Sequence, residues 1–157
     1  MKNKIEFFVA TVLLFAVYFG IIPYKLNQLN EALNLPNFNN SFLEIIGFIF
    51  IILGITTYLL TAKTFFKVAG NTPLIIHPTR SVMKTSLYKR TRNPMYIGHL
   101  ILIFGEFLIY GSILIFFFWI FTVVFLHCLV VFYEEPLTKK RLGRSYEEYL
   151  GKVPRWI

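Results

Sequence analysis

Long apolar runs alternate with polar and basic stretches along the chain. The first run extends from Phe7 to about Pro23, and the second from Phe42 to Leu60. A third run, Ile97 to Tyr133, would form a helix about 55 Å long at 1.5 Å per residue, which exceeds a hydrocarbon core of about 30 Å. This run must therefore fold back, and Gly111-Ser112 is the expected corner. The pattern predicts four membrane-spanning helices.

Two polar motifs mark the expected starts of the second and third helices. Ser41, followed three positions later by Glu44, forms a capping box. Asn93-Pro94 combines an N-cap residue with a proline at the first helical position, so the third helix should begin there. The amino end of that helix then offers unpaired N–H groups to a carboxylate or phosphate.

Further motifs organise the end of the chain. Glu134-Glu135 stand where the fourth helix is expected to leave the membrane, with Gly143 as a later C-cap. Ser145 with Glu148 predicts a capping box for one more short helix. The predicted fold class is all-α: an integral membrane bundle of about four transmembrane helices with a cytoplasmic loop and a short C-terminal helix.

The composition supports a membrane protein. Of the 157 residues, 56% are hydrophobic and 15% charged, whereas a soluble domain carries about 25% charged residues. This excludes a disordered chain, a collagen-like protein and an ordinary soluble enzyme. The lone Cys128 cannot form an internal disulfide. The length suits a single membrane domain, 1–157, in which 1–62 holds two spans and 63–157 holds the loop, a helical hairpin and the tail.

The charge distribution predicts the orientation. The net charge is +8, from 16 basic residues and 8 acids. The basic residues flank apolar runs, which favours a membrane surface over nucleic acid. They concentrate in the 63–92 segment and in the tail, whereas the Tyr24–Ser41 loop holds only Lys25. By the positive-inside rule, the chain is a multi-pass protein with both termini and the middle loop in the cytoplasm.

Ionisable residues inside the third span are expensive in lipid. Glu106 and His99 lie seven positions apart and so share a helix face. Two interpretations are open. Glu106 and His99 contact the substrate, or Glu106 is protonated or lies near the far membrane interface, while Gly98 and Gly105 allow close helix packing. His127 shares a predicted helix face with Glu134. The spacing of the three histidines and the single cysteine does not match that of metal ligands, so no metal site is predicted.

The acid pair Glu134-Glu135 also has two interpretations. Adjacent carboxylates at a helix carboxyl end oppose the helix dipole and repel each other. A ligand that carries hydroxyl groups or positive charge would compensate for this. Alternatively, the two charges are solvated and balanced by Lys139 and Lys140.

An ordered set of motifs between Gly70 and Ile157 resembles the isoprenylcysteine carboxyl methyltransferase and phospholipid methyltransferase group of integral membrane enzymes. The motifs that carry the resemblance are Tyr88, Arg92-Asn93-Pro94-Met95-Tyr96-Ile97-Gly98, Glu134-Glu135-Pro136-Leu137, Leu142-Gly143, Tyr146, Tyr149 and Val153-Pro154-Arg155. The resemblance implies S-adenosylmethionine as cofactor, held at the cytoplasmic ends of the last helices, and a substrate that enters from the lipid.

The resemblance also implies site residues by position. The expected cofactor contacts are Tyr88, Asn93, Pro94, Met95, Tyr96, Glu134 and Glu135, with a further strip at Arg80, Ser81, Val82 and Met83. These residue types suit the parts of S-adenosylmethionine. A helix amino end can bind its carboxylate, acidic side chains can bind its ribose hydroxyls or its ammonium, and aromatic rings can enclose its adenine.

The sequence departs from the family pattern at three places. Asn93 replaces the usual histidine, and Ser86-Leu87 replaces a frequent Gly-Pro. Val130 stands where the eukaryotic carboxyl methyltransferases place an arginine that holds the substrate carboxylate. This last departure disfavours an isoprenylcysteine carboxylate as the acceptor.

The expected function is methyl transfer from S-adenosylmethionine to a lipophilic acceptor in the bilayer: an isoprenylcysteine-like carboxylate, a phospholipid amine or another small lipophilic molecule. No catalytic residue is assigned, and His99 and Glu106 are the candidate substrate contacts. The alternative is a small transporter with Glu106 as its coupling residue, although transport would need neither the basic loop nor the patterned tail. A membrane scaffold would leave the acid pair unexplained.

Overall fold

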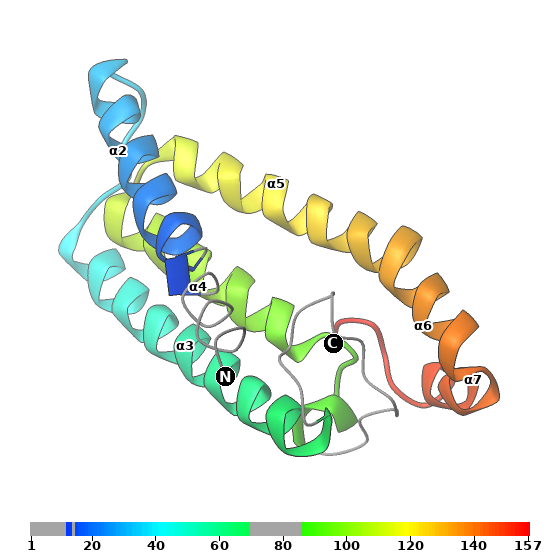
Figure 1. The fold of residues 1–157 in the computed structure, drawn as a ribbon. Helices are drawn as coiled ribbons and strands as arrows, with labels where there is room; N and C mark the ends of the chain where they lie inside the picture. Colours follow the sequence, from blue (N-terminus) through cyan, green and yellow to red (C-terminus); the bar gives the residue numbers. More distant parts are fainter. Residues whose placement is uncertain (1–11, 14, 70–85) are drawn as a thin grey trace. The chain divides into compact units, whose positions relative to one another are not determined.

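The computed structural model describes residues 12–13, 15–69 and 86–157, and these are helical apart from turns and short connections (Figure 1). No β-strand occurs in this described part, only an isolated bridge between Asn37 and Ser112. The all-α prediction is therefore confirmed. The elements in chain order are the π turn η1 (Val17–Ile21), α2 (Ile22–Ala32), α3 (Ser41–Ala69), the 3₁₀ turn η2 (Ser86–Lys89), α4 (Pro94–Tyr110), α5 (Ile113–Leu129), the π turn η3 (Val130–Glu134), α6 (Glu135–Leu142) and α7 (Arg144–Leu150).

Two helical stretches of the described chain are long and apolar enough to cross a membrane, namely Ser41–Thr64 and Ile113–Leu142. The apolar helix Pro94–Tyr110 is shorter. At 1.5 Å per residue its 17 residues extend about 25 Å, less than a hydrocarbon core of about 30 Å. The prediction of four spans therefore stays a prediction for α4 and for the first run.

The helix does not end at Pro23, the residue at which the first span is predicted to end. The helix continues through α2 to Ala32, so the expected loop from Tyr24 onward is wrong for this stretch. The physical reason lies in the wide turn η1, where the Ile22 N–H bonds to the Val17 carbonyl, five residues back. Pro23 then falls in the first turn of α2, where a missing N–H costs nothing.

The second helix starts at the predicted place with a different cap. The Oδ1 atom of Asn40 accepts a hydrogen bond from the Leu43 N–H at 3.0 Å, and the Glu44 N–H bonds to the Asn40 carbonyl. Asn40 is thus the N-cap, and the predicted box of Ser41 with Glu44 is wrong. Asn and Ser are about equally good caps, so their order alone did not decide between them.

The chain divides into two compact units. Unit 1 comprises Met1–Ile51 and Leu102–Ile120, and unit 2 comprises Ile52–Ile101 and Phe121–Ile157. Each is described by itself.

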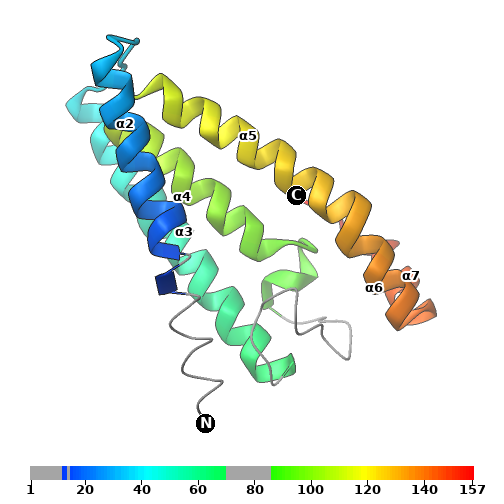
Figure 2. The same ribbon diagram turned by 45° about the horizontal axis from the view of Figure 1, so that its top comes forward.

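In unit 1, α3 and α4 approach closely along their glycines, and both ribbon views show the two helices side by side (Figure 2). A Cβ atom on Gly105 would lie 2.8 Å from the Gly47 carbonyl oxygen and 2.9 Å from the Ile51 nitrogen. The absence of a side chain on Gly105 and Gly47 allows the two helix backbones to approach this closely. Aromatic rings fill the adjacent space, with Phe104 5.5 Å from Phe50 and 5.1 Å from Trp119 between ring centroids.

The predicted corner at Gly111-Ser112 is confirmed, because α4 ends at Tyr110 and α5 begins at Ile113. Gly111 has φ +64°, and a Cβ atom there would overlap the Asn39 backbone nitrogen. Side-chain amides bond to the last carbonyls of α4, from Asn37 to Tyr110 at 3.0 Å and from Asn39 to Ile109 at 2.9 Å. The 37–39 segment is thus held against this corner.

In unit 2, the fourth predicted helix does not end at the acid pair. It continues through η3 into α6, so Glu134 is the N-cap of α6 and Glu135 begins it. The expected position at a helix carboxyl end is therefore wrong. The acid pair lies inside one continuous helical stretch, Ile113–Leu142, at neither of its ends.

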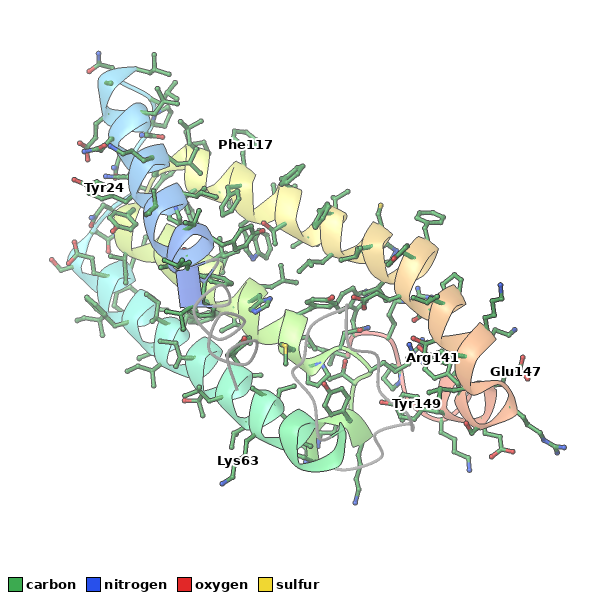
Figure 3. The ribbon with its side chains drawn as sticks, in the orientation of Figure 1. Tyr24, Lys63, Phe117, Arg141, Glu147 and Tyr149 are labelled. Atoms are coloured by element: carbon green, nitrogen blue, oxygen red, sulfur yellow. The ribbon has the colours of Figure 1, made fainter. Side chains whose placement is uncertain are left out.

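Two short helices complete unit 2. Gly143 ends α6 as predicted, with φ +55°, and it also serves as the N-cap of α7. The predicted box of Ser145 with Glu148 is wrong, because the Ser145 hydroxyl donates to the Leu142 carbonyl at 2.9 Å. Tyr149 is buried and Glu147 exposed, and the two side chains leave α7 in different directions (Figure 3).

Candidate functional site

The amino end of α4 begins at Pro94, as predicted. The Asn93 side chain does not point its donors at a ligand, because its amide donates to the Arg155 carbonyl at 2.9 Å. The Asn93 N–H bonds to the Thr91 hydroxyl, and the Arg92 N–H bonds to the Pro154 carbonyl. These bonds tie the two residues before α4 to the loop and the tail, and the unpaired N–H groups in the first turn of α4 stay a prediction.

Tyr96 and Glu134 meet half a turn beyond this amino end. The Tyr96 hydroxyl donates a hydrogen bond to Oε1 of Glu134, 38 residues away along the chain. Both side chains are partly buried. A carboxylate and an aromatic ring from different helices therefore stand together, as the motif resemblance required.

Glu135 takes a different set of partners. Its carboxylate accepts hydrogen bonds from Arg92 Nη1 at 2.8 Å and from Arg155 Nε and Nη2, each at 2.9 Å. Consecutive helical residues point about 100° apart, so two neighbouring acids reach different partners. The idea that Lys139 balances the pair is wrong, because Lys139 bonds to Glu147 at 3.0 Å.

Tyr88 is buried near the carboxylate of Glu134, and its own carbonyl accepts a hydrogen bond from the Tyr149 hydroxyl at 2.7 Å. Burial raises the pKa of Tyr88 well above its usual range, and the nearby Tyr149 and Glu134 raise it further. The phenol therefore stays neutral, and it remains a hydrogen-bonding group at any physiological pH.

The tail holds these groups in place. Tyr146, Tyr149 and Val153 form a small buried core. From this core the chain returns to α4, where the Arg155 carbonyl accepts hydrogen bonds from both Thr91 and Asn93. Trp156 then donates from its indole N–H to Nδ1 of His127 at 3.1 Å.

His99 lies next to Tyr96 in the same unit. Its ring stacks on Tyr58 of α3 with centroids 5.1 Å apart, and the Tyr96 ring centroid is 6.1 Å away. Glu106, the other candidate substrate contact, belongs to unit 1. It is 6% exposed, and its Oε2 atom is buried without a hydrogen-bond partner among the described residues.

The predicted residues thus separate into three groups. Unit 2 brings together Tyr88, Asn93, Pro94, Tyr96 and Glu134, and it places Met95 beside them on α4. The strip Arg80, Ser81, Val82 and Met83 lies outside the described residues. Glu135 is present but is engaged by two guanidinium groups.

Three contributors were missed as members of this site, namely Thr91, Arg92 and Arg155. The available signal was charge complementarity, since the two arginines belong to motifs of the same ordered set as Glu135, the acid that they bind. The hydroxyl of Thr91 gave no such signal, because its role depends on the position of the Arg155 carbonyl, to which it donates.

A family model described as phospholipid methyltransferase matches residues 42–145. The matched region includes α4, α5, the acid pair and the Arg92–Gly98 motif. The comparisons with curated proteins and with solved structures gave no match.

Proposed function

Because the chain belongs to the phospholipid methyltransferase family, we propose that it is a membrane methyltransferase that transfers a methyl group from S-adenosylmethionine to a lipophilic acceptor. We place it in the bilayer as a single domain with four spans and with both termini in the cytoplasm. The observation that carries the proposal is the contact of Tyr96 with Glu134 beside Tyr88.

The residues of unit 2 fit such a cofactor. Glu134 offers a partly buried carboxylate for ribose hydroxyls or for the ammonium, and Tyr88 and Tyr96 offer aromatic surface for adenine. When bound, the sulfonium supplies an already electrophilic methyl group. The chain then needs mainly to orient the two reactants and to exclude water.

We assign the two acids different tasks. Glu134 has one hydrogen-bond donor within the described residues, Tyr96, and its charge faces Tyr88. Glu135 has both oxygens engaged by Arg92 and Arg155, so it fixes the tail over the amino end of α4. Glu134 is therefore the acid that contacts the cofactor, and Glu135 supports the site from behind.

Near the acid pair, the proposed site offers an apolar surface to the methyl acceptor. Val130 is 1% exposed and begins η3, four residues before Glu134. An apolar side chain at this position offers nothing to a substrate carboxylate, so we favour an amine or another uncharged acceptor group. The transporter alternative, with Glu106 as its coupling residue, has no support in the family match.

A binding experiment tests the proposal. Titration of the detergent-solubilised chain with S-adenosylmethionine in a calorimeter should give a saturable isotherm. Glu134→Gln should weaken this affinity by roughly tenfold or more, because a hydrogen bond to a charged group is worth roughly 1.5–3 kcal/mol. The thermal unfolding profile should stay that of the parent chain.

The matched control is Glu147→Gln on α7, where the acid is exposed and pairs with Lys139. It should bind like the parent chain. Equal affinity of Glu134→Gln and the parent would remove Glu134 from the site, and no heat of binding in the parent would overturn the assignment of the cofactor.

A further inference from the structure

The helix that carries the acid pair extends well past it. The continuous stretch Ile113–Leu142 has 30 residues, and at 1.5 Å per residue it is about 45 Å long. Figure 2 shows α6 as the direct continuation of α5. A hydrocarbon core of about 30 Å takes up about 20 of these residues, beginning at the apolar residues that follow Gly111. The last part of the stretch, about ten residues long, therefore lies at the level of the lipid headgroups or beyond them.

The side chains of this last part change from apolar to basic along the helix. Phe132 and Tyr133, which directly precede the acid pair, are 76% and 54% exposed. Leu137, Lys140 and Arg141 follow, and all three are exposed. Their spacing of three and four residues places them on one side of the helix, here called the outer face of α6. Aromatic residues followed by basic ones are typical of the boundary between hydrocarbon and headgroups.

The acids near the outer face are already paired with other cations. Glu147 of α7 bonds to Lys139 at 3.0 Å, and Glu148 lies 3.5 Å from Arg144. Within the described parts of the chain, no ion pair joins either basic residue of the outer face to an acid. The outer face therefore presents two positive charges to an external anion.

We propose that the outer face of α6 binds the headgroup of an anionic phospholipid, with Lys140 and Arg141 on the phosphate and Leu137 against the upper part of an acyl chain. An ammonium and a guanidinium donate charge-assisted hydrogen bonds to phosphate oxygens, and a guanidinium can donate two in parallel. This surface lies outside the proposed methyl-transfer site, and the inference does not depend on that reaction.

The charge of the outer face selects the headgroup. A zwitterionic headgroup carries its own cation beside the phosphate, and the two basic side chains repel that cation. An anionic headgroup has a net negative charge and meets no such repulsion, so each Lys or Arg close to it strengthens binding. Because α6 begins at Glu135, a lipid bound to its outer face also holds the helix of the acid pair at the membrane surface.

The test counts the lipids that the purified chain retains. The chain in detergent is equilibrated with equal amounts of phosphatidylglycerol and phosphatidylcholine, and the retained lipids are counted by native mass spectrometry. The parent chain should retain phosphatidylglycerol in excess. The double variant Lys140→Gln, Arg141→Gln should lower this excess by roughly tenfold or more, because each basic residue near an anionic headgroup is worth roughly fivefold in affinity. Its melting temperature should equal that of the parent, since both side chains are exposed.

The matched control is the double variant Lys25→Gln, Lys63→Gln, which removes the same net charge from exposed residues of α2 and α3. It should keep the excess of phosphatidylglycerol. Exchange of the two cations, Lys140→Arg with Arg141→Lys, should bind like the parent chain, because both charges remain.

Three results would overturn the proposal. The parent chain retains both lipids equally, or the two double variants lose the same amount, so that only the net charge matters. In the third, glycerol 3-phosphate displaces the lipid, which would assign the outer face to a soluble phosphate. None of these results changes the outcome of the titration with S-adenosylmethionine that tests the proposed function.

Discussion

The guanidinium of Arg155 meets the carboxylate of Glu135 at two points, Nε on Oε1 and Nη2 on Oε2, each at 2.9 Å. The two residues are 20 positions apart, and Arg92 donates to the same carboxylate at 2.8 Å. The Glu135 and Arg92 side chains are 15% and 12% exposed, so solvent screens the pair only partly. This three-residue cluster joins the end of the chain to α6 and to the loop that leads into α4.

The first prediction concerns this cluster. Glu135→Gln should destabilise the chain by about 2 kcal/mol, because it leaves two guanidinium groups without their counter-charge. Thermal denaturation in detergent should show a melting temperature lower by roughly 5 °C. The control Glu148→Gln removes an exposed pair with Arg144 and should melt with the parent chain. Equal melting of Glu135→Gln and Glu148→Gln would contradict the role of the cluster.

The second prediction concerns the close approach of α3 and α4 in unit 1. Gly105→Ala adds a Cβ atom 2.8 Å from the Gly47 carbonyl oxygen, so the helices must separate. We expect a loss of about 1–3 kcal/mol, measured by thermal denaturation. Gly20→Ala is the control, because nothing lies within 4 Å of its added Cβ. A Gly105→Ala protein as stable as Gly20→Ala would show that the helices do not need this contact.

The third prediction separates backbone strain from steric overlap. Gly143→Ala forces an alanine into a left-handed conformation in open space, which costs about 1–3 kcal/mol. Gly111→Ala suffers similar strain and in addition an overlap with the Asn39 backbone. The yield of folded protein in detergent should therefore drop much further for Gly111→Ala. Similar yields would mean that the 37–39 segment moves aside easily.

The fourth prediction concerns alkaline pH. Burial raises the pKa of Tyr149 to about 12, from a usual value of about 10. Between these values the unfolded chain has lost a proton that the folded chain retains, so the stabilisation present below pH 10 is lost as the pH rises through 12. A phenolate absorbance titration should show a late step that Tyr149→Phe lacks and that Tyr24→Phe keeps. An unchanged titration of Tyr149→Phe would contradict this assignment.

The sequence predicted the helices well where a local rule decides. The turn at Gly111-Ser112 followed from the length of one apolar run, and Pro94 marked the start of α4 because proline lacks an N–H. The all-helical class followed from apolar runs too long for strands. In each case the information lies within a few neighbouring residues.

Other features depended on competition between similar local options or on partners that are distant along the chain. The choice of Asn40 over Ser41 as a cap and the wide turn at Val17–Ile21 arise from competition between nearly equal local options. The separation of Glu134 from Glu135 depends on Tyr96, Arg92 and Arg155, which lie 20 to 43 positions away. The motifs predicted that these residues belong together, but not which acid binds which partner.

The extra residue that η3 takes into its turn has a consequence for comparing this chain with other sequences. A π turn accommodates one extra residue in nearly the rotation of an ordinary helical turn. Removing one residue between Val130 and Glu134 would therefore restore an ordinary helix and leave Glu134 and Glu135 in their present directions. A one-residue gap at this point of an alignment would keep the partners of both acids, although every later position would be numbered one lower.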